Sequence, residues 1–268
     1  MAHRLRNVQC SNTVFYAVFP LSIKSIYETV KNMYTEPTLY GVQRLKSKIV
    51  KQLSHEFRTP LTSILGFAEI LEEDVQIDED QRIEYASYIR NEGLRLTKLI
   101  NDLVELDSLE QECVDLHLEE YEIQETALYA IMLVADPAHK KFIHISIELP
   151  NEPIRIKIDR ERIVHVLFQL LHNAVRFTKQ NGHIHVKVEI SDKHVVISIR
   201  DTGPGIPPRD IPFLFQRFGK QYRPSEEAQN GGIGLAIAKK IIDQHSGDIS
   251  VQSSMGIGST FTVRIPIL

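Results

Sequence analysis

The chain has 268 residues, a length that suits two modest domains better than one small core. Its 43% hydrophobic and 25% charged residues are typical of a globular protein, and a net charge of −4 argues against a nucleic-acid partner, which needs a basic face. Cys10 and Cys113 fit neither a disulfide framework nor a metal site, and no apolar run reaches the roughly 20 residues of a membrane helix. We therefore expect a cytoplasmic chain, or the cytoplasmic part of a larger one, with no membrane segment.

The first 40 residues have no readable pattern and stay unassigned, as an input segment or a linker. From Val42 onward, apolar residues recur at steps of four and three, which is the seam of a packed helix. The first seam consists of Phe57, Leu61, Ile64, Ala68 and Leu71, and after an acidic break the second consists of Tyr85, Ile89, Leu96, Leu99, Leu103 and Leu106. Two such helices with a short loop predict an antiparallel hairpin over residues 41–110. One hairpin cannot cover both seams, so we expect two copies to pair into a four-helix bundle, that is, a homodimer.

From residue 111 to residue 268 the pattern of apolar residues changes, and strand-like segments alternate with helix-like ones. Alternating or continuous β-branched runs predict strands at 142–149, 154–159, 183–190, 194–200, 248–254 and 259–266. Helical periodicity lies between them at 123–141, 159–178 and 231–247. The predicted fold class is α+β: a helical hairpin followed by an α/β sandwich, a sheet with helices on one face.

The stretch SHEFRTPLTSILG, residues 54–66, places a histidine, an acid and a proline inside the first helical pattern. Each helical residue advances by about 100°, so His55 faces away from the apolar seam, with Thr59 one turn further on the same outward side. A proline inside a helix costs about 3 kcal/mol, so Pro60 needs a reason. A solvent-facing histidine alone is common and without meaning, but its combination with Glu56, Thr59 and Pro60 favours a function.

The stretch LLHNAVRFT contains an asparagine and a basic–aromatic pair that could contact a nucleotide. Asn173 lies on a helical pattern, with Arg176 and Phe177 about one turn later. An asparagine oxygen is a hard ligand that suits Mg²⁺, which commonly bridges phosphates. Taken alone, Asn173 fits a surface role equally well.

Two glycine-containing stretches follow. In RDTGPGIP, Asp201 ends an apolar strand, and a buried carboxylate needs a donor such as an adenine amino group, while Gly203 and Gly205 allow a tight turn beside a ligand. In NGGIGLAIAKKI, Gly232 and Gly234 precede an apolar helix whose first amides could meet phosphate oxygens, although helix capping is the simpler use. The polar, breaker-rich segment between these stretches predicts a mobile flap.

The histidine stretch resembles the phosphoacceptor box of the sensor histidine kinases of two-component signalling. The three later stretches together resemble the asparagine box and two glycine boxes of the Bergerat-type ATP-binding domain, which histidine kinases share with DNA gyrase and the large heat-shock chaperones. The resemblance covers residues 42–268 and implies that His55 is phosphorylated, with Glu56 as the neighbouring acid–base. It also implies ATP and Mg²⁺ as cofactors, with Asn173 as the metal ligand and Asp201 as the adenine-binding residue.

Further residues take roles by the same resemblance. Arg176 and Phe177 match the basic and aromatic pair of the asparagine box, and the flap corresponds to the nucleotide lid. Gln169 stands where these kinases commonly have a second asparagine, and Lys220 stands where they often have arginine. Both still offer an amide or a charge to a nucleotide.

The function predicted from these residues is an ATP-dependent protein histidine kinase that passes the phosphoryl group from His55 to an aspartate of a response regulator. Thr59 matches the position that helps to place water for dephosphorylating that partner, so a dual kinase and phosphatase is a second hypothesis. The alternatives are a gyrase-like ATPase, which Gln169 disfavours because an amide cannot act as a general base, and a catalytically weak scaffold or pseudokinase. The source of the stimulus stays open between an upstream sensor, a partner protein and a small input segment within the first 40 residues.

Overall fold

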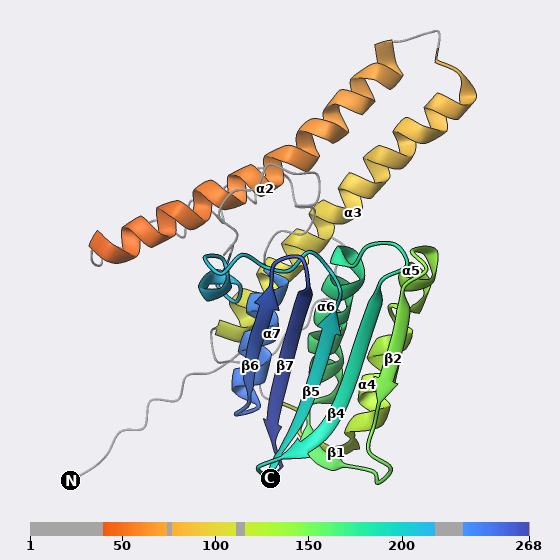
Figure 1. Ribbon diagram of the computed structural model, residues 1–268. Coiled ribbons are helices and arrows are strands. Elements are labelled where there is room, and N and C mark those ends of the chain that lie inside the picture. The colour runs from red at the N-terminus through yellow and green to blue at the C-terminus, as the bar shows by residue number, and fades with distance from the viewer. Residues whose placement is uncertain (1–39, 74–76, 111–115, 218–232, 268) are drawn as a thin grey trace, which may run out of the picture. The chain divides into compact units, whose positions relative to one another are not determined.

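The computed structural model describes residues 40–73, 77–110, 116–217 and 233–267 (Figure 1). Lys220, Gly232 and nearly all of the unassigned N-terminal segment lie outside these ranges, as does most of the predicted flap. Within the described ranges, every helix is too short or too polar to cross a membrane.

The predicted hairpin is present as helices α2 (Tyr40–Glu73) and α3 (Glu79–Glu110). The acidic break between the seams starts the second helix: the Asp78 carboxylate accepts a hydrogen bond from the Gln81 amide at 2.8 Å, and the Gln81 side chain accepts one from the Asp78 amide at 3.3 Å. This reciprocal arrangement satisfies two backbone donors at the start of α3. Phe67 joins the two helices, because its ring stacks on Tyr85 and Tyr88 at centroid distances of 5.5 and 4.9 Å.

The second part of the chain is built on a five-stranded sheet in the order β2-β4-β5-β7-β6. Its strands are β2 (His144–Glu148), β4 (His183–Ser191), β5 (His194–Asp201), β6 (Asp248–Ser254) and β7 (Gly258–Pro266). Among the strands that the structure describes, only β2 and β4 pair in parallel. All five strands were predicted, and so was β3 (Arg155–Ile158), which pairs instead with β1 (Glu119–Glu122) in a small separate ladder. Strand β1 was missed because its sequence, EEYE, has no apolar alternation.

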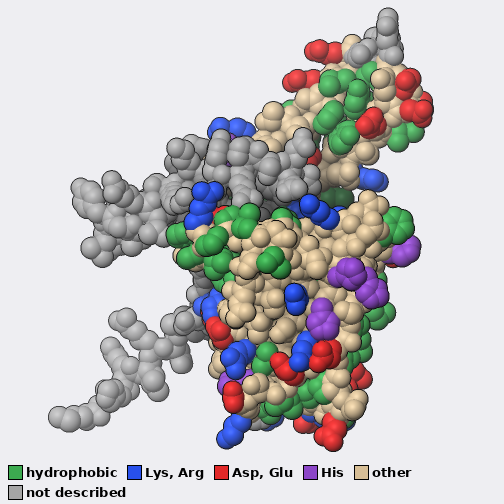
Figure 2. Space-filling model, viewed as in Figure 1, with side chains coloured by type: hydrophobic (Ala, Val, Ile, Leu, Met, Phe, Trp, Pro, Cys, Tyr) green, Lys and Arg blue, Asp and Glu red, His purple; other side chains and the backbone are tan. Residues whose placement is uncertain are grey.

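The helices of this part lie on one face of the sheet, as predicted (Figure 1). They are α4 (Ile123–Met132), α5 (Ala135–Lys140), α6 (Arg160–Phe177) and α7 (Gly234–Gln244), with the short 3₁₀ turn Ile211–Phe213 before the last. The single helix predicted over 123–141 is in fact α4 and α5, because Pro137 has no amide hydrogen to continue the ladder across the turn. None of the described helices covers the other sheet face, and histidines gather on it near the β2–β4 edge, where the rings of His144 and His183 lie 5.7 Å apart (Figure 2).

Candidate active site

Helix α2 presents His55 to solvent, as the helical period predicted. The side chains of His55 and Thr59 are exposed, whereas Glu56 is half-buried and Pro60 is buried. The Thr59 hydroxyl donates a hydrogen bond to the His55 carbonyl oxygen at 3.2 Å, so it engages the backbone and leaves the imidazole to other partners. The helix continues past Pro60 to Glu73, and the proline therefore sits inside an uninterrupted helical segment.

Helix α6 carries the asparagine stretch. It begins at the cap residue Asp159, whose carboxylate accepts a hydrogen bond from the Arg162 amide at 3.2 Å. Its apolar side is fully packed, and the buried members are Ile163, Val166, Leu167, Leu170, Leu171, Ala174 and Val175. Asn173 is half-buried, and the Arg176 guanidinium lies 5.1 Å from the centre of the Phe177 ring, within cation–π range.

The C-terminal end of α6 is held by Lys141, which follows α5. The Lys141 ammonium donates hydrogen bonds to the carbonyl oxygens of Val175, Arg176 and Thr178 at 3.0, 2.7 and 3.4 Å. The last carbonyls of a helix have no partner within the helix, and a cation there also complements the helix dipole. Lys141 therefore fixes the turn of α6 that carries Arg176 and Phe177.

Asp201 lies where the sequence placed it, at the buried end of β5, with 6% of its surface exposed. Its carboxylate accepts a hydrogen bond from the Gly203 amide at 2.8 Å, and burial raises its pKa above the ordinary value. A methyl group on Gly203 would lie 2.7 Å from that carboxylate and 3.1 Å from the Phe177 carbonyl oxygen. The glycine thus lets the loop after β5 lie directly against the end of α6.

A second glycine, Gly234, allows the start of α7 to lie close to α6. A methyl group on Gly234 would lie 2.7 Å from the side-chain oxygen of Gln169, which is itself buried. Gln169 is one turn before Asn173 on α6 and lies on the same side of the helix. The structure therefore gathers three predicted stretches around α6, with Gly203 at one end and Gly234 near the middle.

Gly205 has a more local role. Its φ of +72° is in the left-handed region, and a side chain there would collide with the Ser254 carbonyl at the end of β6. The loop after β5 can pack against that strand end only with glycine at this position.

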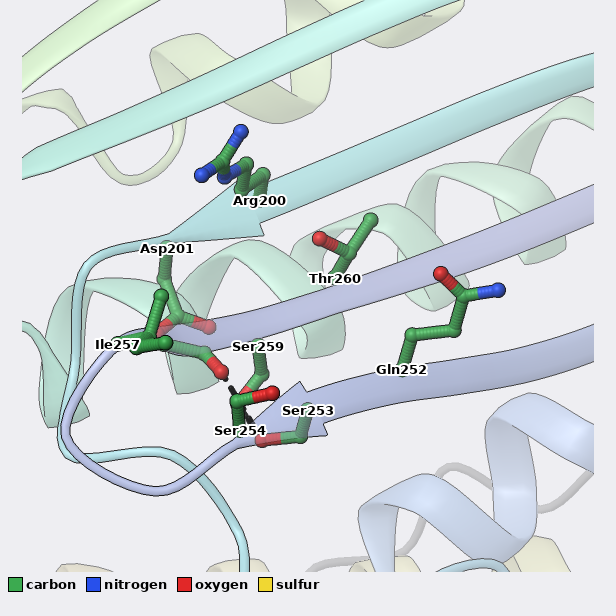
Figure 3. Close-up of a pocket in the computed structure, with 9 residues that line it drawn as sticks. Arg200, Asp201, Gln252, Ser253, Ser254, Ile257, Ser259 and Thr260 are labelled. Carbon is green, nitrogen blue, oxygen red and sulfur yellow. Dashed lines mark hydrogen bonds between the residues drawn. The ribbon is translucent and has the colours of Figure 1, made fainter.

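A small cavity of about 160 Å³ adjoins Asp201, where β5 and β6 end and β7 begins (Figure 3). Neighbours along a strand face opposite sides, so Arg200, Gln252 and Thr260 line it from the open face of the sheet, away from the buried side of Asp201. The cavity is smaller than the 300–1,000 Å³ of typical ligand pockets. Arg200 and Asp201 of the stretch RDTGPGIP line it, whereas neither Asn173 nor any other residue of α6 does.

Three residues that contact α6 or lie on it have no signal in the sequence. Lys141 lies far from α6 in the chain, and His165 and Glu105 are joined by a contact across 60 positions. No residue spacing reports contacts of this kind, and an ordinary lysine or histidine has no motif around it to single it out.

Comparison with known proteins agrees with this geometry. The model described as "His Kinase A (phospho-acceptor) domain" matches residues 45–112, and the model described as "Histidine kinase-, DNA gyrase B-, and HSP90-like ATPase" matches residues 158–268. The circadian input-output histidine kinase CikA of Synechococcus elongatus is 33% identical over 227 residues, which is 82% of this chain and 30% of that protein. The chain spans about a third of the length of such curated relatives.

Solved structures include the catalytic domain of the histidine kinase ThkA, with 31% identity, a TM-score of 0.51, and coverage of 56% of this chain and 96% of that one. The structure of ThkA in complex with the response regulator protein TrrA matches with 27% identity and a TM-score of 0.70, over 90% of this chain and 67% of that one. Two observations support the same family. The region that matches the phosphoacceptor model contains an exposed helical histidine, and the region that matches the ATPase model contains the motifs gathered on α6. The chain belongs to the sensor histidine kinase family and contains its phosphoacceptor and ATP-binding regions.

Proposed function

We propose that this chain is an ATP-dependent protein histidine kinase that phosphorylates itself on His55. The observation that carries the proposal is the exposure of His55 on α2, inside the region that matches the phosphoacceptor model. The gathering of Asn173, Asp201 and Gly234 around α6 supports a nucleotide site in the second region.

The proposed chemistry needs alignment and charge neutralisation more than covalent help from the nucleotide-binding region. A neutral imidazole nitrogen is a competent nucleophile near pH 7. It attacks the γ-phosphorus of ATP, a P–N bond forms, the bond to the β,γ-bridging oxygen breaks, and ADP leaves with that electron pair. The ring proton passes to Glu56, which lies next to His55 and is half-buried.

In this proposal Asp201 accepts a hydrogen bond from the adenine amino group. The raised pKa of Asp201 reports that burial disfavours its charge, and a donor in the site would offset that cost. Asn173 fits a Mg²⁺ ligand, because its side-chain amide forms no hydrogen bond with any other residue in the described ranges. A bound Mg²⁺ would neutralise phosphate charge there.

The proposed partner is the receiver domain of a response regulator, whose aspartate takes the phosphoryl group from His55. The solved complex of ThkA with the response regulator protein TrrA supports this kind of partner. Thr59, exposed one turn after His55, is proposed to place water for the reverse dephosphorylation. In this reading Thr59→Ala lowers phosphatase activity and leaves labelling of His55 unchanged.

We also propose that the chain pairs with a second copy through the hairpin. Large apolar side chains are exposed there in the single chain, namely Leu61, Leu65, Ile70, Ile83, Leu94 and Val104 at 41–64% of their surface (Figure 2). Sedimentation at micromolar concentration should give twice the mass of 30.7 kDa. A monomer at these concentrations would contradict the proposed homodimer.

Incubation with γ-labelled ATP and Mg²⁺ tests the kinase proposal directly. The expected label is acid-labile and base-stable, and His55→Gln abolishes it. His139→Gln is the matched control, because His139 is also exposed on a helix, α5, and should leave labelling unchanged. A folded chain that binds nucleotide but takes no label would instead be the scaffold or pseudokinase.

A further inference from the structure

A chain of three side chains joins the second hairpin helix to the nucleotide motifs. His165, on α6, lies between Glu105 on α3 and Gln169 one turn later on α6. Its Nδ1 atom is 3.0 Å from a Glu105 carboxylate oxygen, and its Nε2 atom is 3.0 Å from the Gln169 amide nitrogen. The side chains of His165 and Glu105 are 27% and 34% exposed, so the contact is partly shielded from water.

The chemistry of the three groups fixes the direction of both hydrogen bonds. A carboxylate only accepts, so the Nδ1 atom of His165 must carry a hydrogen and donate it to Glu105. The amide NH₂ of Gln169, which only donates, faces Nε2 at 3.0 Å, so Nε2 is an acceptor and the ring has its hydrogen on Nδ1 alone. The tautomer of His165 therefore determines which end of the Gln169 carboxamide points at it.

The other end of that carboxamide is the oxygen, which lies against Gly234 at the start of α7. If His165 offered a hydrogen instead of a lone pair, Gln169 would have to turn its oxygen toward His165 and its NH₂ toward Gly234. Asp102, on α3, also lies near this chain of side chains, and burial raises its pKa.

We propose that His165 is a positioning residue for nucleotide binding, held in one tautomer by Glu105 so that the Gln169 oxygen faces the glycine motif of α7. This rests on the proposed function of that site as an ATP site. It also explains how glutamine can stand at this position: its longer side chain is anchored at the nitrogen by His165 and packed at the oxygen against Gly234. The same contact makes the orientation of Gln169 depend on a residue of the hairpin.

The test measures binding of a non-hydrolysable ATP analogue with Mg²⁺ by calorimetry, in the full chain carrying His55→Gln so that no transfer occurs. His165→Leu removes the acceptor and should weaken binding about fivefold to tenfold, the worth of one hydrogen bond. His165→Gln should restore binding to within about twofold, because its amide can accept from Gln169 and donate to Glu105. Glu105→Ala should also weaken binding, since it releases the tautomer without touching the packed side of α6.

The matched control is His185→Leu, because His185 also pairs with a glutamate, Glu148, at 3.5 Å on the sheet. It should leave affinity unchanged. Nitrogen-15 spectra of the imidazole give a readout that does not need nucleotide: Nδ1 of His165 should be protonated and Nε2 bare, and Glu105→Ala should shift this pattern.

Three results would overturn the inference: an unprotonated Nδ1, wild-type affinity in His165→Leu, or a folded His165→Gln as weak as His165→Leu. A failure of the proposed kinase function would give a different result. The tautomer of His165 and the nucleotide affinities of the variants would then be as expected, but the wild-type chain would take no label on His55.

Discussion

Lys141 offers a sharp test of how the nucleotide region is held together. Lys141→Met keeps most of the apolar stem of the side chain and removes the ammonium that meets the carbonyls of Val175, Arg176 and Thr178. Two of these hydrogen bonds, at 2.7 and 3.0 Å, are short, and the third, at 3.4 Å, is long. Hydrogen bonds to charged groups are worth about 1.5–3 kcal/mol, and a cation at a helix C-terminus adds up to about 1 kcal/mol. Because these values are not additive, we expect a loss of about 2–3 kcal/mol.

Urea unfolding followed by circular dichroism measures this loss as a lower midpoint at constant slope. Lys140→Met is the matched control, since Lys140 is the exposed neighbour on the same turn, and its loss should stay under about 0.5 kcal/mol. Nucleotide affinity should fall in Lys141→Met as well, because the loosened turn carries Arg176. Equal stability of the two variants would refute the assignment of Lys141 as the cap of α6.

Two further changes test the loop after β5. Gly205→Ala should cost at least about 2 kcal/mol, because it adds a collision with Ser254 to the strain of a positive φ, whereas Gly256→Ala, at φ +77° with open space around it, should cost only about 1 kcal/mol; equal losses in urea unfolding would contradict the packing argument. Burial raises the folded-state pKa of Asp201, so its ionisation costs stability as the pH rises from below the unfolded value of 3.8 through the folded value. Asp201→Asn should therefore gain stability relative to the wild type as the pH rises above the unfolded value of 3.8, while losing nucleotide affinity, and a stability difference independent of pH would contradict this.

Strong local periodicity explains what could be predicted from the sequence. Six strands and the two long helices have apolar residues at the period of their own structure, and the outward position of His55 follows from its spacing relative to the seam. Strand β1 could not be predicted in this way, because it is made by pairing with β3 and has little apolar pattern of its own. The division between α4 and α5 was recoverable in principle from Pro137, although the apolar period runs across it.

The residues of the candidate site also divide into those that the sequence indicates and those that only the fold shows. Residue types and their order along the chain indicated Asn173, Asp201 and Gly234, because the chemistry of a nucleotide demands amide, carboxylate and close-packed backbone. Lys141 and the Glu105–His165 pair could not be found, since each acts on a segment that is distant in sequence. Such supporting residues are defined only by the fold.

The glycines acquire a second meaning once the fold is known. The sequence alone predicts that Gly203 and Gly234 let the backbone approach a ligand. In the structure each is also a place where one protein segment approaches another: Gly203 lies against the end of α6 at Phe177, and Gly234 lies against Gln169. A side chain at either position would separate the very motifs that must act together. Packing around α6 is therefore by itself sufficient to require glycine at both positions. A phosphate could then approach the same backbone, because no side chain covers it.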